Sequence, residues 1–167
     1  MRVADAEELT RWIAESALPE RFHGCVMCAI ADGARDAELV VRREPGAVVV
    51  LDRFAASRGH LLVVLDAHEE DLASLAWSSW ERMQRLAWES SRALDRCLKP
   101  RRIFVAALGS ATASAKSFPH LHLHVVPLHE DGESARPAHV FSWSRGVHVY
   151  EPGEAEALVS GLRAAWP

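Results

Sequence analysis

One short segment constrains this chain more than any other: residues 120–126 read His-Leu-His-Leu-His-Val-Val. Successive side chains of a strand point to opposite faces, so the alternation predicts a strand that carries His120, His122 and His124 on one face and buries the aliphatic residues between them. An exposed polar face that happens to be histidine is the alternative. Because histidine is among the rarer residues and imidazole titrates near neutrality, three on one face indicate a nucleophile, proton donors or metal ligands.

The remaining pattern predicts an α+β chain, with a mostly antiparallel sheet of five or more strands packed against one long helix. Short β-branched or apolar runs predict further strands at residues 38–43, 47–52, 61–65 and 103–108. The run 61–65 is almost wholly apolar and is expected at the centre of the sheet. Between residues 69 and 98, apolar side chains recur every three or four positions, which predicts the long helix, and Lys99-Pro100 ends it.

Additional elements are expected at both ends of the chain. Helical spacing of apolar residues predicts a helix at 4–17. The tail predicts strands at 140–143 and 147–150 and a closing helix at 152–166. With 167 residues, the whole chain (1–167) fits a single domain.

Charge and composition exclude several classes of protein. The 19 Lys and Arg residues are outnumbered by 23 Asp and Glu residues, which argues against a nucleic-acid binder that relies on neutralising phosphates. No apolar run approaches the roughly 18 residues that a membrane span requires, and the acidic N-terminal segment does not resemble a signal peptide. Three cysteines do not make a disulfide framework. A cytoplasmic protein without nucleic-acid or membrane partners is expected.

The alternating segment, with Pro127 after it, resembles the signature of the histidine triad (HIT) family of nucleotide hydrolases and transferases. The resemblance includes Leu51-Asp52 and, eight positions further on, the pair Gly59-His60 at the start of a strand. It covers about residues 25–128, which leaves 129–167 as a C-terminal extension. It implies a HIT-like fold, a nucleotide or dinucleotide substrate, and pairing into a homodimer.

The resemblance also implies a role for individual residues. His122, in the middle of the triad, is expected to attack the α-phosphorus of a nucleotide and form a covalent intermediate, with its other ring nitrogen bonded to a backbone carbonyl of the same strand. His124 is expected to bind a phosphate oxygen, and His60 to support the active-site network. Asp52 matches an acidic residue that accepts the ribose hydroxyls, and Ser117 matches a hydroxyl that donates to the phosphates or the leaving group.

A metal site is the second implication of the resemblance. Cys25 and Cys28 form a Cys-x-x-Cys pair, which alone is weak evidence and fits two buried thiols on a turn equally well. In zinc-bearing members of the family, such a pair joins a histidine after the third strand and the first histidine of the triad. Here these positions are His68 and His120, and a closed set of two thiolates and two imidazoles suits a structural zinc. Cys97 is expected in the core.

The loop before the triad departs from the family pattern. Ser110 and Ala111 stand where Asn and Gly are usual, and Lys116 replaces a Gln. Ser110 is still expected to contact the nucleotide, while Lys116 either adds a cation to the phosphate site or is a solvated loop residue. A nucleotide phosphoanhydride or phosphoramidate hydrolase acting on adenine nucleotides is the favoured function. A nucleotidyltransferase or phosphorylase, and a non-catalytic nucleotide-binding protein, are the alternatives.

Three tryptophans of the long helix bear on the homodimer. Trp77 and Trp88 lie about 20° apart on a helical wheel and Trp80 lies about 60° from Trp77, which predicts one broad aromatic face. Such a face is typical of a surface covered by a partner, although the terminal helix at 152–166 could cover it equally well.

Overall fold

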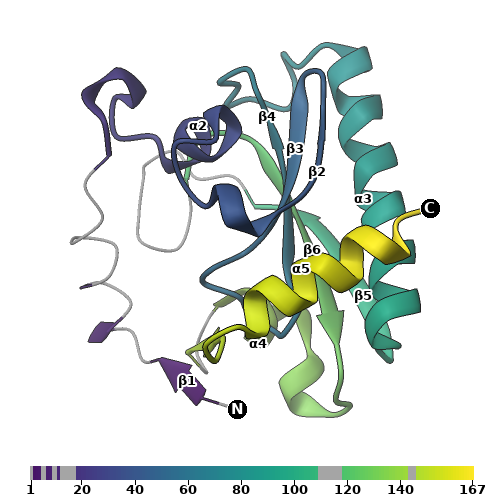
Figure 1. Ribbon diagram of the computed structural model, residues 1–167. Helices are drawn as coiled ribbons and strands as arrows, with labels where there is room; N and C mark the ends of the chain where they lie inside the picture. Colours follow the sequence, from purple (N-terminus) through teal and green to yellow (C-terminus); the bar gives the residue numbers. More distant parts are fainter. Residues whose placement is uncertain (1, 5–6, 9–10, 12–17, 109–117, 143–145) are drawn as a thin grey trace.

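The computed structural model describes residues 2–4, 7–8, 11, 18–108, 118–142 and 146–167, and it is centred on a five-stranded antiparallel sheet (Figure 1). The strands lie in the order β2-β3-β4-β6-β5. Their bounds are β2 Val40–Glu44, β3 Ala47–Leu51, β4 Leu61–Leu65, β5 Arg102–Ala107 and β6 His122–Leu128. The apolar run 61–65 is the middle strand, as predicted. Because β3, β4 and β6 are buried along their whole length, both faces of the sheet are covered there.

The long helix α3 (Trp77–Leu98) covers one face of the sheet with a stripe that includes Met83 and Leu86. It begins later than the predicted residue 69. The side chain of Asp71 accepts a hydrogen bond from the backbone N–H of Ala73 (2.9 Å), and such local bonds compete with helix formation. The helix ends as predicted, because Lys99 adopts a left-handed conformation (φ 49°) immediately before Pro100.

The opposite face carries α2 (Val26–Asp32), a helix that the sequence pattern did not reveal. Cys25 caps its N-terminus, where its sulfur accepts the N–H of Cys28 at 3.4 Å, and Gly33 ends it with a φ of 82°. Two short 3-10 turns flank it, η1 (Glu20–Phe22) and η2 (Ala37–Leu39). A helix this short has too few turns to give a clear periodic signal.

The C-terminal extension folds back against both β6 and α3. The strand predicted at 140–143 is wrong: after the turn η3 (Glu133–Ala135), residues Pro137–Ser142 form a short helix, α4. Proline favours the first position of a helix, and the N–H of Val140 bonds the carbonyl of Arg136 at 3.1 Å. Val140 is then buried against β6, so its apolar character serves packing rather than strand pairing.

The last two elements agree with the sequence. Strand β7 (Val147–Val149) pairs antiparallel with β1 (Arg2–Ala4) in a separate two-stranded sheet, and α5 (Glu154–Ala165) packs beside α3 (Figure 1). The helix predicted at 4–17 lies mostly outside the described residues. Among the residues that the structure describes, no helix combines the length and apolar character needed to cross a bilayer.

Candidate active site and metal centre

The histidines of the triad lie on and just before β6, the strand between β4 and β5. Their side chains are buried rather than exposed, with 0%, 3% and 6% of the surface of His120, His122 and His124 accessible. The aliphatic residues between them pack into the main core, as predicted. The three rings divide between two clusters: the His122 and His124 ring centres are 4.7 Å apart, whereas the His120 ring lies 4.8 Å from that of His68.

The ring of His122 is held in one orientation by the strand itself. Its Nδ1 lies 2.8 Å from the carbonyl oxygen of His120, and only an Nδ1–H can donate to that oxygen. Burial lowers the pKa of His122, although the hydrogen bond to His120 opposes this shift, so the ring is neutral at pH 7. A neutral imidazole with its proton on Nδ1 carries its lone pair on Nε2, and Nε2 is therefore the nucleophilic atom.

Asp52, His60 and His124 form a chain of polar contacts beside His122. The Nδ1 of His124 lies 3.0 Å from the Nε2 of His60, and the Nδ1 of His60 lies 3.0 Å from a carboxylate oxygen of Asp52. Burial opposes ionisation of Asp52, but the charge and hydrogen bond of His60 outweigh it, so the pKa of this carboxyl lies below its usual value. Burial, together with His60 and His122, lowers the pKa of His124 to about 2.

These directions assign the protons along the chain, which we call the relay (Asp52, His60, His124). The Nδ1 of His60 faces both a carboxylate oxygen of Asp52 (3.0 Å) and the backbone N–H of Ala56 (3.1 Å). The ionised carboxylate is the stronger partner, so the proton lies on Nδ1 and is donated to Asp52, and the Nε2 of His60 then accepts the Nδ1–H of His124. The Nε2 of His124 keeps a lone pair. A proton taken up there is stabilised through His60 by the negative charge of Asp52. The sequence placed Asp52 and His60 in the site but did not reveal that they bond each other.

The four residues expected to bind a metal converge in a second cluster. The ligand atoms of Cys25, Cys28, His68 and His120 all lie within 4.8 Å of one another. The Nδ1 of His68 is 3.2 Å from the sulfur of Cys28, and the Nδ1 of His120 is 3.4 and 3.5 Å from the two sulfurs. Tetrahedral zinc bonds of about 2.3 Å to sulfur and 2.0–2.1 Å to nitrogen separate the two kinds of ligand by about 3.6 Å. The donor set therefore fits zinc in identity and spacing.

The remaining ring nitrogens of both histidines support the same assignment. The Nε2–H of His120 donates to the carbonyl of Leu65 (3.2 Å), and the Nε2–H of His68 donates to Glu70 (2.9 Å). Each proton is thus fixed on Nε2, and each Nδ1 lone pair faces the sulfurs, as in metal sites with an orienting outer shell. Burial and the neighbouring Cys25 raise the pKa of the Cys28 thiol to about 11, so a cation is needed to hold a thiolate there. The sequence did not single out Glu70.

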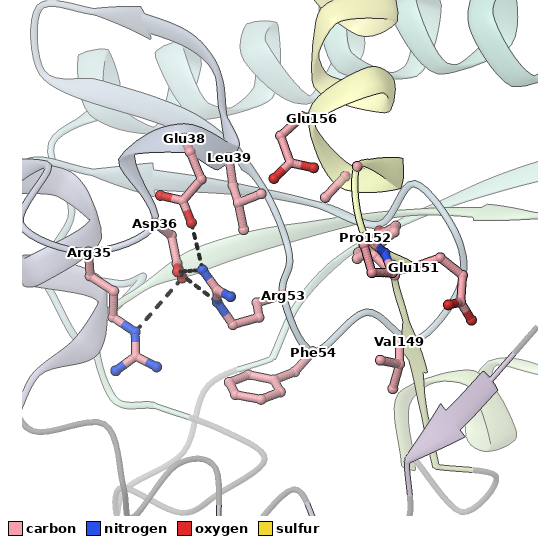
Figure 2. Close-up of a pocket in the computed structure, with 13 residues that line it drawn as sticks. Arg35, Asp36, Glu38, Leu39, Arg53, Phe54, Val149, Glu151, Pro152 and Glu156 are labelled. Carbon is pink, nitrogen blue, oxygen red and sulfur yellow. Dashed lines mark hydrogen bonds and ion pairs between the residues drawn. The ribbon is translucent and has the colours of Figure 1, made fainter.

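A cavity of about 630 Å³ lies at the start of the loop that follows β3, and its wall includes Arg53 and Phe54, the two residues after Asp52 (Figure 2). The guanidinium of Arg53 bonds Asp36 at 2.8 Å and Glu38 at 2.7 Å. Residues 149–156, at the junction of β7 and α5, form the facing wall. No role was predicted from the sequence for this part of the extension.

The loop before the triad completes the set of expected residues. Ser110, Lys116 and Ser117, with Ala111, fall in residues 109–117, which lie outside the described part of the chain. Their expected contacts with a nucleotide stay predictions.

Comparison with known proteins identifies the family. The HIT domain model matches residues 35–131, which contain the relay, His68 and the triad but not Cys25 and Cys28. A HIT-like protein of Mycoplasma genitalium is 30% identical over 109 residues, or 65% of this chain and 76% of the relative. A HIT-like protein of Mycobacterium tuberculosis is 30% identical over 141 residues, or 84% of this chain and 92% of the relative.

The fold agrees with these matches. A Zn-bound histidine triad family protein from Mycobacterium smegmatis superposes with a TM-score of 0.65 at 26% identity, over 84% of this chain and 91% of that one. A histidine triad nucleotide-binding protein from Sulfolobus tokodaii shares the fold with a TM-score of 0.64 at 20% identity, over 84% and 91% of the two chains. Sequence and structure agree that the chain belongs to the histidine triad (HIT) family.

Proposed function

We propose that this protein hydrolyses a nucleotide phosphoanhydride or phosphoramidate, with adenine nucleotides as the first substrates to test, through a nucleotidyl intermediate on His122. The observation that carries the proposal is the 2.8 Å bond from Nδ1 of His122 to the carbonyl of His120, because it keeps a lone pair on Nε2. Covalent catalysis requires such a neutral nucleophile with a fixed orientation.

The reaction has two displacements at the same phosphorus. In the first, Nε2 of His122 forms a bond to the α-phosphorus while the bond to the leaving group breaks. The leaving oxygen or nitrogen takes the electron pair, and a leaving nitrogen also takes a proton from solvent. In the second, water attacks the phosphorus, the P–N bond breaks and its electron pair returns to Nε2. The pKa of His124 is about 2 in the free protein, and the negative charge of the bound phosphoryl group raises it. Its Nε2 then accepts the proton of the attacking water, and Asp52 stabilises the resulting imidazolium through His60. Ser117 is the proposed donor to the leaving group.

Asp52 also has room for the second role that the resemblance implies. One of its oxygens accepts the N–H of Phe54 (2.9 Å) and the other faces His60, and each carboxylate oxygen can accept a further bond from a ribose hydroxyl. A nucleoside bound there extends its base toward the cavity beside Arg53 and Phe54. The proposed zinc holds four ligands and no open position, so its contribution is to the stability of the fold around His120.

The experiment uses an adenine nucleotide labelled at the α-phosphate, quenched in alkali because phosphorus–nitrogen bonds to histidine are acid-labile. We expect label on the wild-type protein and none on His122→Ala, with a loss of turnover of several orders of magnitude. His139→Ala, which removes a histidine of α4 outside the site, is the matched control. Near wild-type turnover by His122→Ala contradicts the proposal.

The same assay identifies the acceptor. With phosphate added, release of a nucleoside monophosphate supports hydrolysis, whereas formation of a nucleoside diphosphate indicates a phosphorylase. Binding of nucleotide without label or turnover indicates the non-catalytic alternative.

A further inference from the structure

The C-terminal extension contacts the loop that carries the relay. This loop, residues 52–60, joins β3 to β4, with Asp52 at its first position and His60 at its last; we call it the relay loop. It closes on itself through the N–H of Asp52, which bonds the carbonyl of His60 at 2.8 Å. A shift anywhere in so short a closed loop therefore moves one end of the Asp52–His60 bond.

Four hydrogen bonds between described residues join the extension to the relay loop, all from residues 129–154. In two of them a side chain of the extension is the acceptor. The hydroxyl of Tyr150, just after β7, accepts the N–H of Gly59, and the carboxylate of Glu154, at the start of α5, accepts a hydrogen bond from the side chain of Arg58. The other two are made by His148 and His129. The distances are Gly59 N to Tyr150 Oη 3.2 Å, Arg58 Nε to Glu154 Oε1 2.6 Å, His148 N to Ala55 O 2.8 Å and His129 Nε2 to Arg58 O 3.0 Å.

Gly59 is the point where these contacts reach His60 most directly. Its φ is 91°, and a Cβ added there would lie 2.5 Å from Leu98 and 3.3 Å from Pro127. The end of α3 and β6 therefore confine this peptide by packing, while Tyr150 receives its N–H. The ring of Tyr150 also packs edge-on against His148, with ring centres 4.7 Å apart, so the hydroxyl is itself held in place.

We propose that Tyr150 and the Arg58–Glu154 pair are positioning residues that hold His60 in line with Asp52 and His124, so that the C-terminal extension belongs to the catalytic apparatus. This inference rests on the proposed function, because it holds that the contacts of Tyr150 and Glu154 support the proton transfer of that reaction. Hydrogen bonds depend steeply on distance and angle, so a small displacement of His60 weakens both of its bonds in the relay. Proton transfer suffers. Tyr150 also lines the cavity, but Tyr150→Phe keeps the ring and with it the shape of the wall.

Tyr150→Phe is the direct test, because it removes the acceptor of the Gly59 N–H and keeps the aromatic ring. We expect kcat to fall about 10-fold with KM unchanged, since displacements of about 1 Å in an active site cost up to about 100-fold. Glu154→Gln, which weakens the ion pair to Arg58, should act in the same direction. Asp131→Asn is the matched control: it removes an ion pair of the same extension to Arg101, away from the relay loop, and should leave kcat unchanged.

A double-mutant cycle separates positioning from general stability. If Tyr150 acts through His60, Tyr150→Phe lowers kcat in the wild type but has no further effect on the residual rate of His60→Asn. Equal fold-losses in the two backgrounds, or a change confined to KM or thermal stability, overturn the proposal.

A spectroscopic measurement keeps this proposal distinct from the function it rests on. In ¹⁵N-labelled protein without nucleotide, Tyr150→Phe should shift the ring-nitrogen resonances of His60 and His124, and Asp131→Asn should not. If the wild type has no activity on any nucleotide but these shifts occur, the proposed function fails and the positioning contact stands. Unchanged ring resonances in Tyr150→Phe contradict the contact itself.

Discussion

Among single residues, His148 connects the stability of the fold to pH. Its ring is 5% exposed, and neither nitrogen has a hydrogen-bond partner among the described residues; the nearest carboxylate, of Glu154, is 3.8 Å away. Burial lowers the pKa of His148, which the charge of Glu154 only partly offsets. Below the ordinary histidine value of 6.5 the unfolded chain therefore binds a proton that the folded protein resists, so stability present at neutral pH is lost as the pH falls.

We expect His148→Phe to lose less thermal stability than the wild type between pH 7 and pH 5, because the variant has no imidazole to protonate. The measurement is the melting temperature of each protein at several pH values in that range. His139→Phe, on the exposed side of α4, should follow the wild type. An equal acid-induced decrease for His148→Phe and the wild type contradicts the assignment.

The cysteines give a second test at the same scale. Cys28→Ser removes a soft ligand from the cluster with Cys25, His68 and His120, so we expect bound zinc to fall well below one per chain and the melting temperature to drop. Metal analysis of protein purified without added metal measures the first effect. Cys97→Ser is the matched control, because Cys97 lies apart from the cluster, against α5 near Gly161. A metal-free wild type that melts at the same temperature with and without chelator contradicts the zinc site.

At the scale of elements, the end of α3 is a place where sequence and backbone geometry conflict. Lys99 adopts a φ of 49°, a conformation that favours glycine because other residues crowd their own Cβ there. We expect Lys99→Gly to stabilise the protein by about 0.5–1 kcal/mol. Chemical unfolding measures the effect, with Arg96→Gly in the last turn of the same helix as a control that should destabilise by about 1 kcal/mol.

The strands of the central sheet were predicted well because their side chains alternate or are wholly apolar, as in 61–65, whereas β1 (Arg2–Ala4) was not predicted. Elements fixed by local hydrogen bonds were not predicted well. The bonds around Asp71 shorten α3, and Pro137 turns residues 137–142 into a helix although Val140 and Phe141 suit a strand. The short helix α2 is defined by the cap at Cys25 and the end at Gly33, which hydrophobic periodicity does not report.

The candidate site was predictable as a set of residues but not as a network. The resemblance brought His60, Asp52 and the triad together, and the structure places them within hydrogen-bond distance in one chain. Tyr150 and Glu154 contact residues more than 90 positions away in the sequence, and periodic patterns, which report only local structure, do not predict such contacts. Glu70 was missed because its role, orienting His68, depends on a turn whose shape the sequence does not specify.

For the whole molecule, the tryptophans of α3 bear on assembly. Trp77 and Trp88 are 73% and 58% exposed, so α5 does not cover them, whereas Trp80 is half-buried against the core. The single aromatic face expected from the wheel is thus divided. Val105 on the edge strand β5 is also 46% exposed. Large exposed apolar side chains on a helix and an edge strand favour a partner surface.

We therefore expect a homodimer that buries Trp88 and Val105. Light scattering at micromolar concentration should give twice the chain mass of 18.5 kDa, and Trp88→Glu should return it to that of one chain. Arg42→Glu, on the edge strand at the other side of the sheet, should leave the dimer intact. A wild-type mass near 18.5 kDa contradicts the dimer.

The pairing of β1 with β7 sets an order of events during synthesis. Residues 2–4 are made well before their partners at 147–149, which follow more than a hundred residues later. The bonds to Ala55, Arg58 and Gly59 wait for residues 148–154. The central sheet has all its strands by residue 128, so a nascent chain can form the triad and the metal cluster while the relay loop still lacks its outer contacts. The relay loop therefore acquires its last supports only when the final fifth of the chain has emerged.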